Sequence, residues 1–152
     1  LENARMLMRE YITWTRTFVD DPESAPTFHN NEQELRELPG PYAAPRGRLF
    51  LALYDEKPAG IVALKPVEAS TSELKRLYVR PDFRGLQIGQ QLVSALIEAA
   101  KSEGYERIVL DSHRSMKSAH RIYRETGFRD VETPASFPGH LRDIVVFMER
   151  EL

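Results

Sequence analysis

The chain has 152 residues, the length of one domain, and its 41% hydrophobic and 29% charged residues are typical of a folded globular protein rather than a disordered or fibrous one. Its 21 lysines and arginines against 23 aspartates and glutamates give a formal net charge of −2, which argues against a general nucleic-acid-binding protein because such proteins carry a basic excess. The sequence has no cysteine, no apolar run near the ~18 residues of a membrane span and no signal-peptide pattern, so we expect a cytoplasmic protein without disulfides, thiolate metal sites or a membrane partner.

The first half of the chain predicts two helices followed by three strands. Apolar residues such as Met8 and Ile12 recur at helical spacing until an Asp-Asp-Pro stretch ends the pattern. The expected elements are helices at Leu1–Val19 and Asn31–Leu38 and strands at Arg48–Tyr54, Gly60–Leu64 and Ser72–Val79, with a hairpin turn at Asp55–Pro58. Because residue 1 is Leu and the first helix begins at once, we expect a single domain over 1–152 whose leading strand is missing from the numbering.

The second half predicts two further helices and three further strands. An amphipathic helix carries Ile88, Leu92 and Leu96 on its buried stripe, and Gly104 is placed to end it. The expected elements are helices at Ile88–Glu103 and Ser115–Glu125, strands at Arg107–Asp111, Phe128–Val131 and Asp143–Met148, and a loop at Thr133–His140. This order predicts an α+β fold with a mixed sheet, because hairpins pair antiparallel and the strand–helix–strand unit from Ser72 to Asp111 pairs parallel.

The segment from Glu73 to Gly89 is the most informative part of the sequence. It reads as a strand, a tight loop with Gly85, and the start of a helix with Gly89. A helix N-terminus presents unpaired N–H groups and a partial positive charge, and Arg84 adds a bidentate donor, so this loop predicts an anion site suited to a pyrophosphate. The alternative is that the glycines only make a turn. The loop is neither a G-x-x-x-x-G-K-[ST] nor a G-x-G-x-x-G motif, so mononucleotide and dinucleotide folds fit poorly.

Two motifs in this order resemble those of the GNAT acyltransferase superfamily. Its loop pattern Q/R-x-x-G-x-G/A matches the stretch from Arg84 to Gly89, and its A-x-x-[LI]-Y helix ending in G-F matches Ala119, Ile122, Tyr123 and the pair at 127–128. The resemblance covers nearly the whole chain. It implies a three-layer α/β/α fold whose mixed, mostly antiparallel sheet has helices on both faces. The implied acetyl-CoA-binding residues are Leu77, Tyr78, Val79, Arg84, Gly85, Leu86, Gln87, Ile88, Gly89, Gln90 and Ala119.

The sequence departs from the family pattern at two positions. Gln87 stands where the middle glycine of the loop is usual, and Met116 stands where an asparagine often precedes the motif alanine. A Cβ at position 87 could crowd a pyrophosphate, although the amide N–H remains available. This departure is the main support for an alternative function, a CoA-binding sensor or interaction module without catalysis.

The resemblance also implies two catalytic residues. Tyr123 matches a tyrosine that lies near the thioester sulfur and would protonate the departing thiolate, whereas helical periodicity alone indicates a core aromatic. Glu73 lies on the strand leading to the loop, where family members often carry a carboxylate, and would act as the base. A lone strand glutamate is otherwise more often a solvated charge. His113, at a strand end, and a water molecule are the alternative bases.

The expected function is direct transfer of an acetyl group from acetyl-CoA to a primary amine of a small molecule or a protein. The absence of cysteine leaves no thiolate to carry the acyl group, and no metal is expected. We expect Trp14, Tyr42 and Phe137 to line the acceptor side, each equally well explained by packing. A local cluster of Arg76, Arg80 and Arg84 would complement the CoA phosphates. The expected partners are acyl-CoA, an amine and a second copy of the chain in a homodimer.

Overall fold

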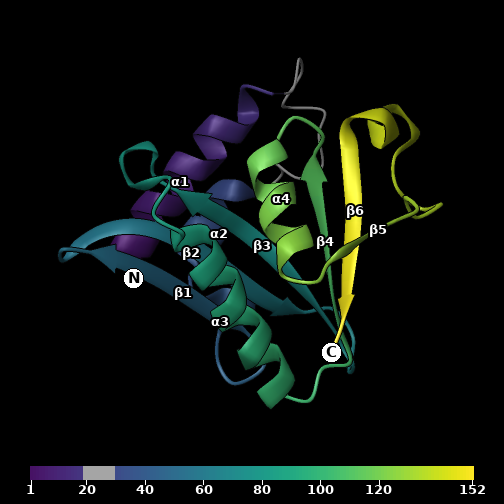
Figure 1. The fold of residues 1–152 in the computed structure, drawn as a ribbon, viewed down its shortest axis with the longest axis horizontal. Coiled ribbons are helices and arrows are strands. Elements are labelled where there is room, and N and C mark those ends of the chain that lie inside the picture. The colour runs from purple at the N-terminus through teal and green to yellow at the C-terminus, as the bar shows by residue number, and fades with distance from the viewer. Residues whose placement is uncertain (19–29) are drawn as a thin grey trace.

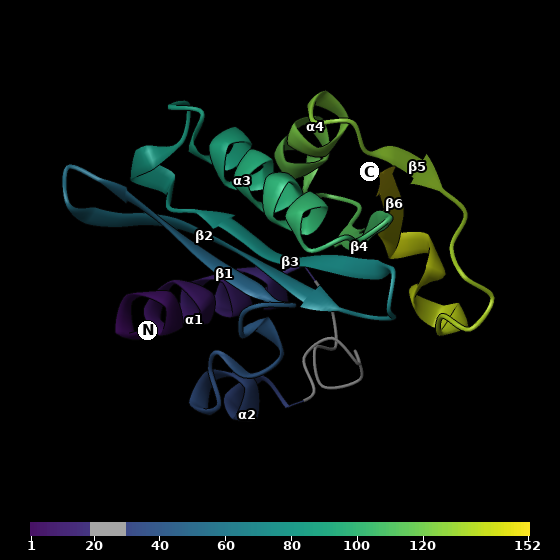
Figure 2. The same ribbon diagram turned by 90° about the horizontal axis from the view of Figure 1, so that it is seen from below.

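A six-stranded sheet lies between two helical layers in the computed structural model, which describes residues 1–18 and 30–152. One face carries α1 (Glu2–Arg16) and α2 (Asn31–Arg36), and the other carries α3 (Ile88–Ser102) and α4 (Lys117–Glu125), as Figure 2 shows. The strands are β1 (Arg48–Tyr54), β2 (Lys57–Pro66), β3 (Thr71–Val79), β4 (Arg107–His113), β5 (Arg129–Val131) and β6 (Val145–Glu151). Short 3-10 helices occupy Gly40–Tyr42, Pro81–Phe83 and Gly139–Ile144.

The strands are ordered β1-β2-β3-β4-β6-β5 across the sheet (Figure 1). Within the described residues β3 and β4 pair parallel, and the other neighbours pair antiparallel. The parallel pair follows from the crossover through α3, because a strand that returns by way of a helix runs in the same direction. The predicted three-layer α+β fold, with a mixed and mostly antiparallel sheet, is confirmed.

Two separate cores fill the spaces on the two faces of the sheet. Val62 and Leu64 of β2 pack toward α3, whereas Ile61 and Ala63 of the same strand pack toward α1. All four side chains are fully buried, because β2 lies between two helical layers. A strand covered on both faces reads as a continuous apolar run, which explains why this segment shows no alternation.

Several element boundaries differ from the expected ones because strand pairing decides them. The strand β2 extends from Lys57 to Pro66, since it pairs along its length with β1 and β3. In its turn with β1, Asp55 and Glu56 have φ values of +49° and +66°. A two-residue hairpin turn whose twist matches that of the strands requires such left-handed conformations at both residues. The strand β6 begins at Val145 and runs to Glu151, opposite all of β4. The first helix ends at Arg16 rather than continuing toward residue 19 as predicted, because residues 17 and 18 form a turn; residue 19 itself lies outside the described residues.

Candidate active site

The strands β3 and β4 pair at one end of the sheet and separate at the other. Their register runs only from Thr71–Arg107 to Glu73–Val109, and Figure 1 shows the two strands diverging beyond it. Just past this point β3 contains a bulge at Arg76, whose φ is +63°, and the β2–β3 register shifts there. Among residues 1–18 and 30–152, no strand therefore pairs with the edge of β3 that faces β4 after Glu73, and a gap opens through the sheet.

A cavity of about 460 Å³, here called the loop cavity, lies on the α3 and α4 side of this gap. It is bounded by the end of β3, the loop before α3 and the first turns of both helices. Ten of the eleven predicted cofactor-binding residues line it: Leu77, Tyr78, Val79, Arg84, Gly85, Gln87, Ile88, Gly89, Gln90 and Ala119. Leu86 does not; its exposed side chain lies in a groove beside β1. The structure shows that these residues line one cavity, and their binding of acetyl-CoA stays a prediction.

The loop cavity has the backbone geometry of an anion site. The first helical bond of α3 runs from the Gln91 N–H to the Gln87 carbonyl, so the N–H groups of Ile88, Gly89 and Gln90 have no acceptor within the helix. No side chain of the described part of the chain caps this end. Gln87 has a φ of +61°, a left-handed conformation that costs a non-glycine residue on the order of 1 kcal/mol. This explains why glycine is usual at the position.

Two neighbours set the shape of the loop cavity. The Arg84 Nε donates to the Val79 carbonyl over 3.0 Å, and its guanidinium lies 5.3 Å from the centre of the Trp14 ring. A Cβ on Gly89 would lie 2.7 Å from Ile122 Cδ1, so this glycine allows α3 to start against α4. Trp14, expected on the acceptor side, lines the loop cavity instead.

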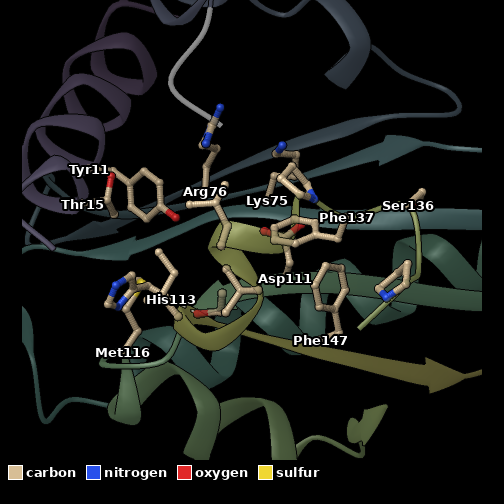
Figure 3. A pocket seen from close by; sticks show the side chains of 16 residues that line it. Tyr11, Thr15, Lys75, Arg76, Asp111, His113, Met116, Ser136, Phe137 and Phe147 are labelled. Carbon is tan, nitrogen blue, oxygen red and sulfur yellow. Dashed lines mark hydrogen bonds between the residues drawn. The ribbon is translucent and has the colours of Figure 1, made fainter. Parts of the chain in front are cut away.

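A second cavity, of about 520 Å³, lies on the other side of the gap (Figure 3). It is called the acceptor-side cavity below, and it is bounded by α1, β3, the end of β4 and the segment before β6. Its lining comprises Tyr11, Thr15, Lys75, Arg76, Asp111, Ser112, His113, Met116, Pro134, Ser136, Phe137, Pro138, Leu141, Ile144, Val145 and Phe147. Met116 lines both cavities, so they meet at this side chain. Phe137 lines this cavity, and its role in binding an acceptor stays a prediction.

The predicted cluster of Arg76, Arg80 and Arg84 does not form. Arg76 is 7% exposed and donates through Nε and Nη2 to the Glu34 carboxylate over 3.0 and 2.6 Å. Arg80 pairs with Glu10 at 2.6 Å. The prediction is wrong because the bulge and the helices α1 and α2 turn these two guanidinium groups to the opposite face. Only Arg84 of the three lines the loop cavity.

The charges of the buried Arg76 and the partly buried Glu34 neutralise each other. Burial alone would raise the pKa of the Glu34 carboxyl, but the hydrogen bonds and charge of Arg76 outweigh it and lower that pKa. Glu34 also accepts a hydrogen bond of 3.1 Å from the Tyr42 hydroxyl. Tyr42 is 2% exposed and lines neither cavity, so its predicted place in the acceptor wall is wrong.

Two opposite charges face the acceptor-side cavity from neighbouring strands. The Lys75 ammonium of β3 and the Asp111 carboxylate of β4 both line it. Neither side chain forms a hydrogen bond or an ion pair within residues 1–18 and 30–152. Burial, with the nearby charge of Arg76, lowers the pKa of Lys75. Neither residue carries a predicted role from the sequence, although a lysine inside a central strand and an aspartate at the end of a buried strand are signals of a possible site.

His113, an alternative to Glu73 as the base, also lines the acceptor-side cavity, but its geometry does not favour that role. Its Nδ1 accepts a hydrogen bond from the Ser115 backbone N–H over 3.1 Å, so the neutral ring carries its proton on Nε2. This buried Nε2 has no partner among the described residues. Burial lowers the pKa of the imidazole, which keeps the ring neutral.

The two predicted catalytic side chains lie outside both cavity linings. Tyr123 of α4 is 4% exposed and packs against Phe128 with ring centres 5.7 Å apart, and burial raises the pKa of its phenol. Glu73 lies where β3 and β4 still pair, and its carboxylate is 3.7 Å from the Lys65 ammonium. Both catalytic roles stay predictions.

The described ranges 1–18 and 30–152 hold no group of three or more His, Asp or Glu side chains arranged to bind a metal ion. Their helices include none with the length and apolar character needed to cross a bilayer.

Known proteins resemble this chain in sequence and in fold. The model of the acetyltransferase (GNAT) family matches residues 4–128. An uncharacterized N-acetyltransferase of Schizosaccharomyces pombe is 35% identical over 134 residues, which cover 87% of this chain and 78% of the relative. PaiA N-acetyltransferase of Thermoplasma acidophilum, solved in complex with coenzyme A, superposes with a TM-score of 0.75 at 21% identity, covering 99% of this chain and 92% of its own. A GNAT acetyltransferase of Elizabethkingia anophelis with acetyl-CoA bound gives 0.61 at 26% identity, covering 70% and 77%. The chain therefore belongs to the GNAT family of acetyltransferases and is an acyltransferase.

Proposed function

We propose that this enzyme transfers an acetyl group directly from acetyl-CoA to a primary amine. One observation carries the proposal: two cavities, one with an anion-binding helix start and one with unpaired charges, meet at Met116 in the gap between β3 and β4. A thioester held in the gap from one side would be within reach of an amine entering from the other. Holding both reactants in place converts a bimolecular reaction into an effectively unimolecular one.

The donor groups of the loop cavity fit a diphosphate. The three free N–H groups at the start of α3 and the Arg84 guanidinium would hold the phosphates of acetyl-CoA, each by charge-assisted hydrogen bonds. The edge of β3 from Leu77 to Val79, with which no strand of the described residues pairs on the β4 side, would bind the amide groups of the pantetheine arm as a neighbouring strand would. A backbone N–H on that edge is suited to stabilise the carbonyl oxygen as it gains charge.

In the transfer itself, the neutral amine nitrogen bonds to the thioester carbonyl carbon, and the carbon–sulfur bond breaks. The thiolate that leaves takes up a proton, for which Tyr123 is the proposed donor. A phenol is protonated at neutral pH even at its ordinary pKa, and burial raises the pKa of Tyr123 further. The amine must lose a proton before or during attack, and Glu73 or a water molecule is the proposed acceptor.

Acetyl-CoA binding and turnover test the proposal separately. We expect acetyl-CoA to raise the melting temperature and to release free thiol when primary amines are added. Tyr123→Phe should lower kcat by roughly 10²-fold or more while acetyl-CoA affinity is retained, whereas Tyr54→Phe, on the exposed edge strand β1, should leave both unchanged.

Three results would contradict the proposal. Binding of acetyl-CoA without thiol release over a broad amine panel would favour the non-catalytic alternative. An acetylated protein trapped by mass spectrometry, or ping-pong kinetics, would exclude direct transfer. If acetyl-CoA does not raise the melting temperature, neither the acetyl transfer nor the non-catalytic CoA-binding function is supported.

A further inference from the structure

The acceptor-side cavity offers one cation and one anion to a ligand. Lys75 and Asp111 lie too far apart to form an ion pair with each other, and neither has another partner in the described part of the chain. Arg76, the other cation of the lining, is already neutralised by Glu34. The Lys75 ammonium is half-buried without a partner, which is costly, and the exposed Asp111 carboxylate faces the same cavity, so the cavity is complementary to a ligand that carries both charges.

The rest of the lining is mainly apolar and aromatic. The rings of Phe137 and Phe147 meet edge to face with centres 5.0 Å apart, and Leu141 is another apolar residue of the lining. Figure 3 shows His113 and Met116 toward one end of the view and Phe147 toward the other, with Lys75 and Asp111 between them. The gap end therefore suits the reacting amine, and the far end suits a large apolar group.

Other acceptor classes fit this lining less well. A polyamine or another polycation needs several carboxylates, whereas Asp111 is the single carboxylate in the described lining. The α-amine of a peptide has an amide, not a carboxylate, on the next carbon. Such a ligand would cover the Lys75 ammonium without supplying its counter-charge, which carries a desolvation penalty.

We propose that the acceptor is an α-amino acid with a large apolar side chain. Its carboxylate binds the Lys75 ammonium, its amine lies beside Asp111 and toward the gap, and its side chain packs against Phe137 and Phe147. This inference rests on the proposed acetyl transfer and assigns its acceptor class. Two-point binding of the carboxylate and the amine fixes the direction of the nitrogen lone pair, which a simple amine would not achieve.

The first test compares matched acceptors in a thiol-release assay with acetyl-CoA. L-Phenylalanine is compared with phenethylamine, which lacks only the carboxylate, with L-phenylalaninamide, in which it is neutral, and with spermidine. Because a charge-assisted bond is lost, we expect kcat/KM for phenylalanine to exceed that for the first two analogues by roughly tenfold or more. Equal or faster turnover of phenethylamine, the amide or spermidine would overturn the inference and leave the acetyl transfer standing.

Two variants separate the charges. Lys75→Met should lower kcat/KM roughly tenfold or more for phenylalanine and leave that for phenethylamine unchanged, because only the former uses the ammonium. Asp111→Asn should lower both, because both acceptors carry the amine. Lys101→Met, on the exposed surface of α3, is the matched control and should change neither value. A Lys75→Met variant that loses activity equally with both acceptors would refute the assigned role of Lys75.

A measurement of amino-acid binding tests the inference independently of turnover. Saturation-transfer NMR of L-phenylalanine with the protein–CoA complex should show binding that Lys75→Met weakens, while CoA affinity stays the same. Absence of phenylalanine binding in a protein that binds CoA would overturn the inference. Absence of CoA binding would overturn the acetyl transfer on which the inference rests.

Discussion

The buried ion pair between Glu34 and Arg76 predicts a large loss of stability on Glu34→Gln. The change keeps the size of the side chain but removes the charge that neutralises a guanidinium only 7% exposed. Breaking a buried pair by removing one partner costs about 3–5 kcal/mol. Because the Gln oxygen can still accept one hydrogen bond, we expect about 3 kcal/mol.

For a chain of this size each kcal/mol lowers the melting temperature by about 2–4 °C, so the expected fall is about 6–12 °C. Urea unfolding followed by Trp14 fluorescence would measure it, because this single tryptophan packs 5.9 Å from Tyr78 across the α1–sheet interface. The matched control is Glu32→Gln in the same helix, whose partner Arg9 is exposed and whose loss should cost at most about 0.5 kcal/mol.

The same variant should also affect binding of acetyl-CoA. Arg76 holds a left-handed φ of +63° at the bulge, immediately before the β3 residues that line the loop cavity. Loss of its anchor should relax the bulge and raise KM for acetyl-CoA more than Glu32→Gln does. The reasoning would be refuted if Glu34→Gln unfolded at the same urea concentration as Glu32→Gln.

Three further predictions concern pH, a turn and a helix contact. The pKa of the Glu34 carboxyl is lower in the folded chain than in the unfolded chain. Its contribution to the free energy of unfolding is therefore present above the pKa of the unfolded chain and is lost as pH falls through the pKa of the folded chain. The difference in stability between wild type and Glu34→Gln should accordingly close in acid unfolding titrations, and a difference that stays constant with pH would contradict this. Glu56→Gly should stabilise the protein by about 0.5–1 kcal/mol in urea melts, because glycine after Asp55 adopts the left-handed φ of the turn between β1 and β2 without strain. A loss of stability would count against that turn geometry. Gly89→Ala should cost about 1–2 kcal/mol through its contact with Ile122, and adding Ile122→Val, which removes the clashing Cδ1, should recover most of the loss; no recovery would place the strain elsewhere.

The bulge in β3 shows why part of the site could not be predicted. Regular alternation would place Leu74, Arg76 and Tyr78 on one face of the sheet. In the structure, Leu74 and Leu77, three residues apart, both pack in the α3 core, and Tyr78 packs toward α1. The bulge shifts the alternation by one residue and sends Arg76 to Glu34. Its partner lies 42 residues earlier in the chain, and nothing in the local sequence indicates the pairing.

The sequence by itself determined the order of elements, the mixed α+β fold and the loop from Arg84 to Gly89. Each depends on short-range properties: hydrophobic periodicity, turn residues and the unpaired amides of a helix start. Only the tertiary structure decided where β3 and β4 separate, which charges lose their partners there, and that Lys75 and Asp111 face one cavity. These features depend on strand register and on contacts between distant segments, and neither can be predicted from the periodicity of the sequence.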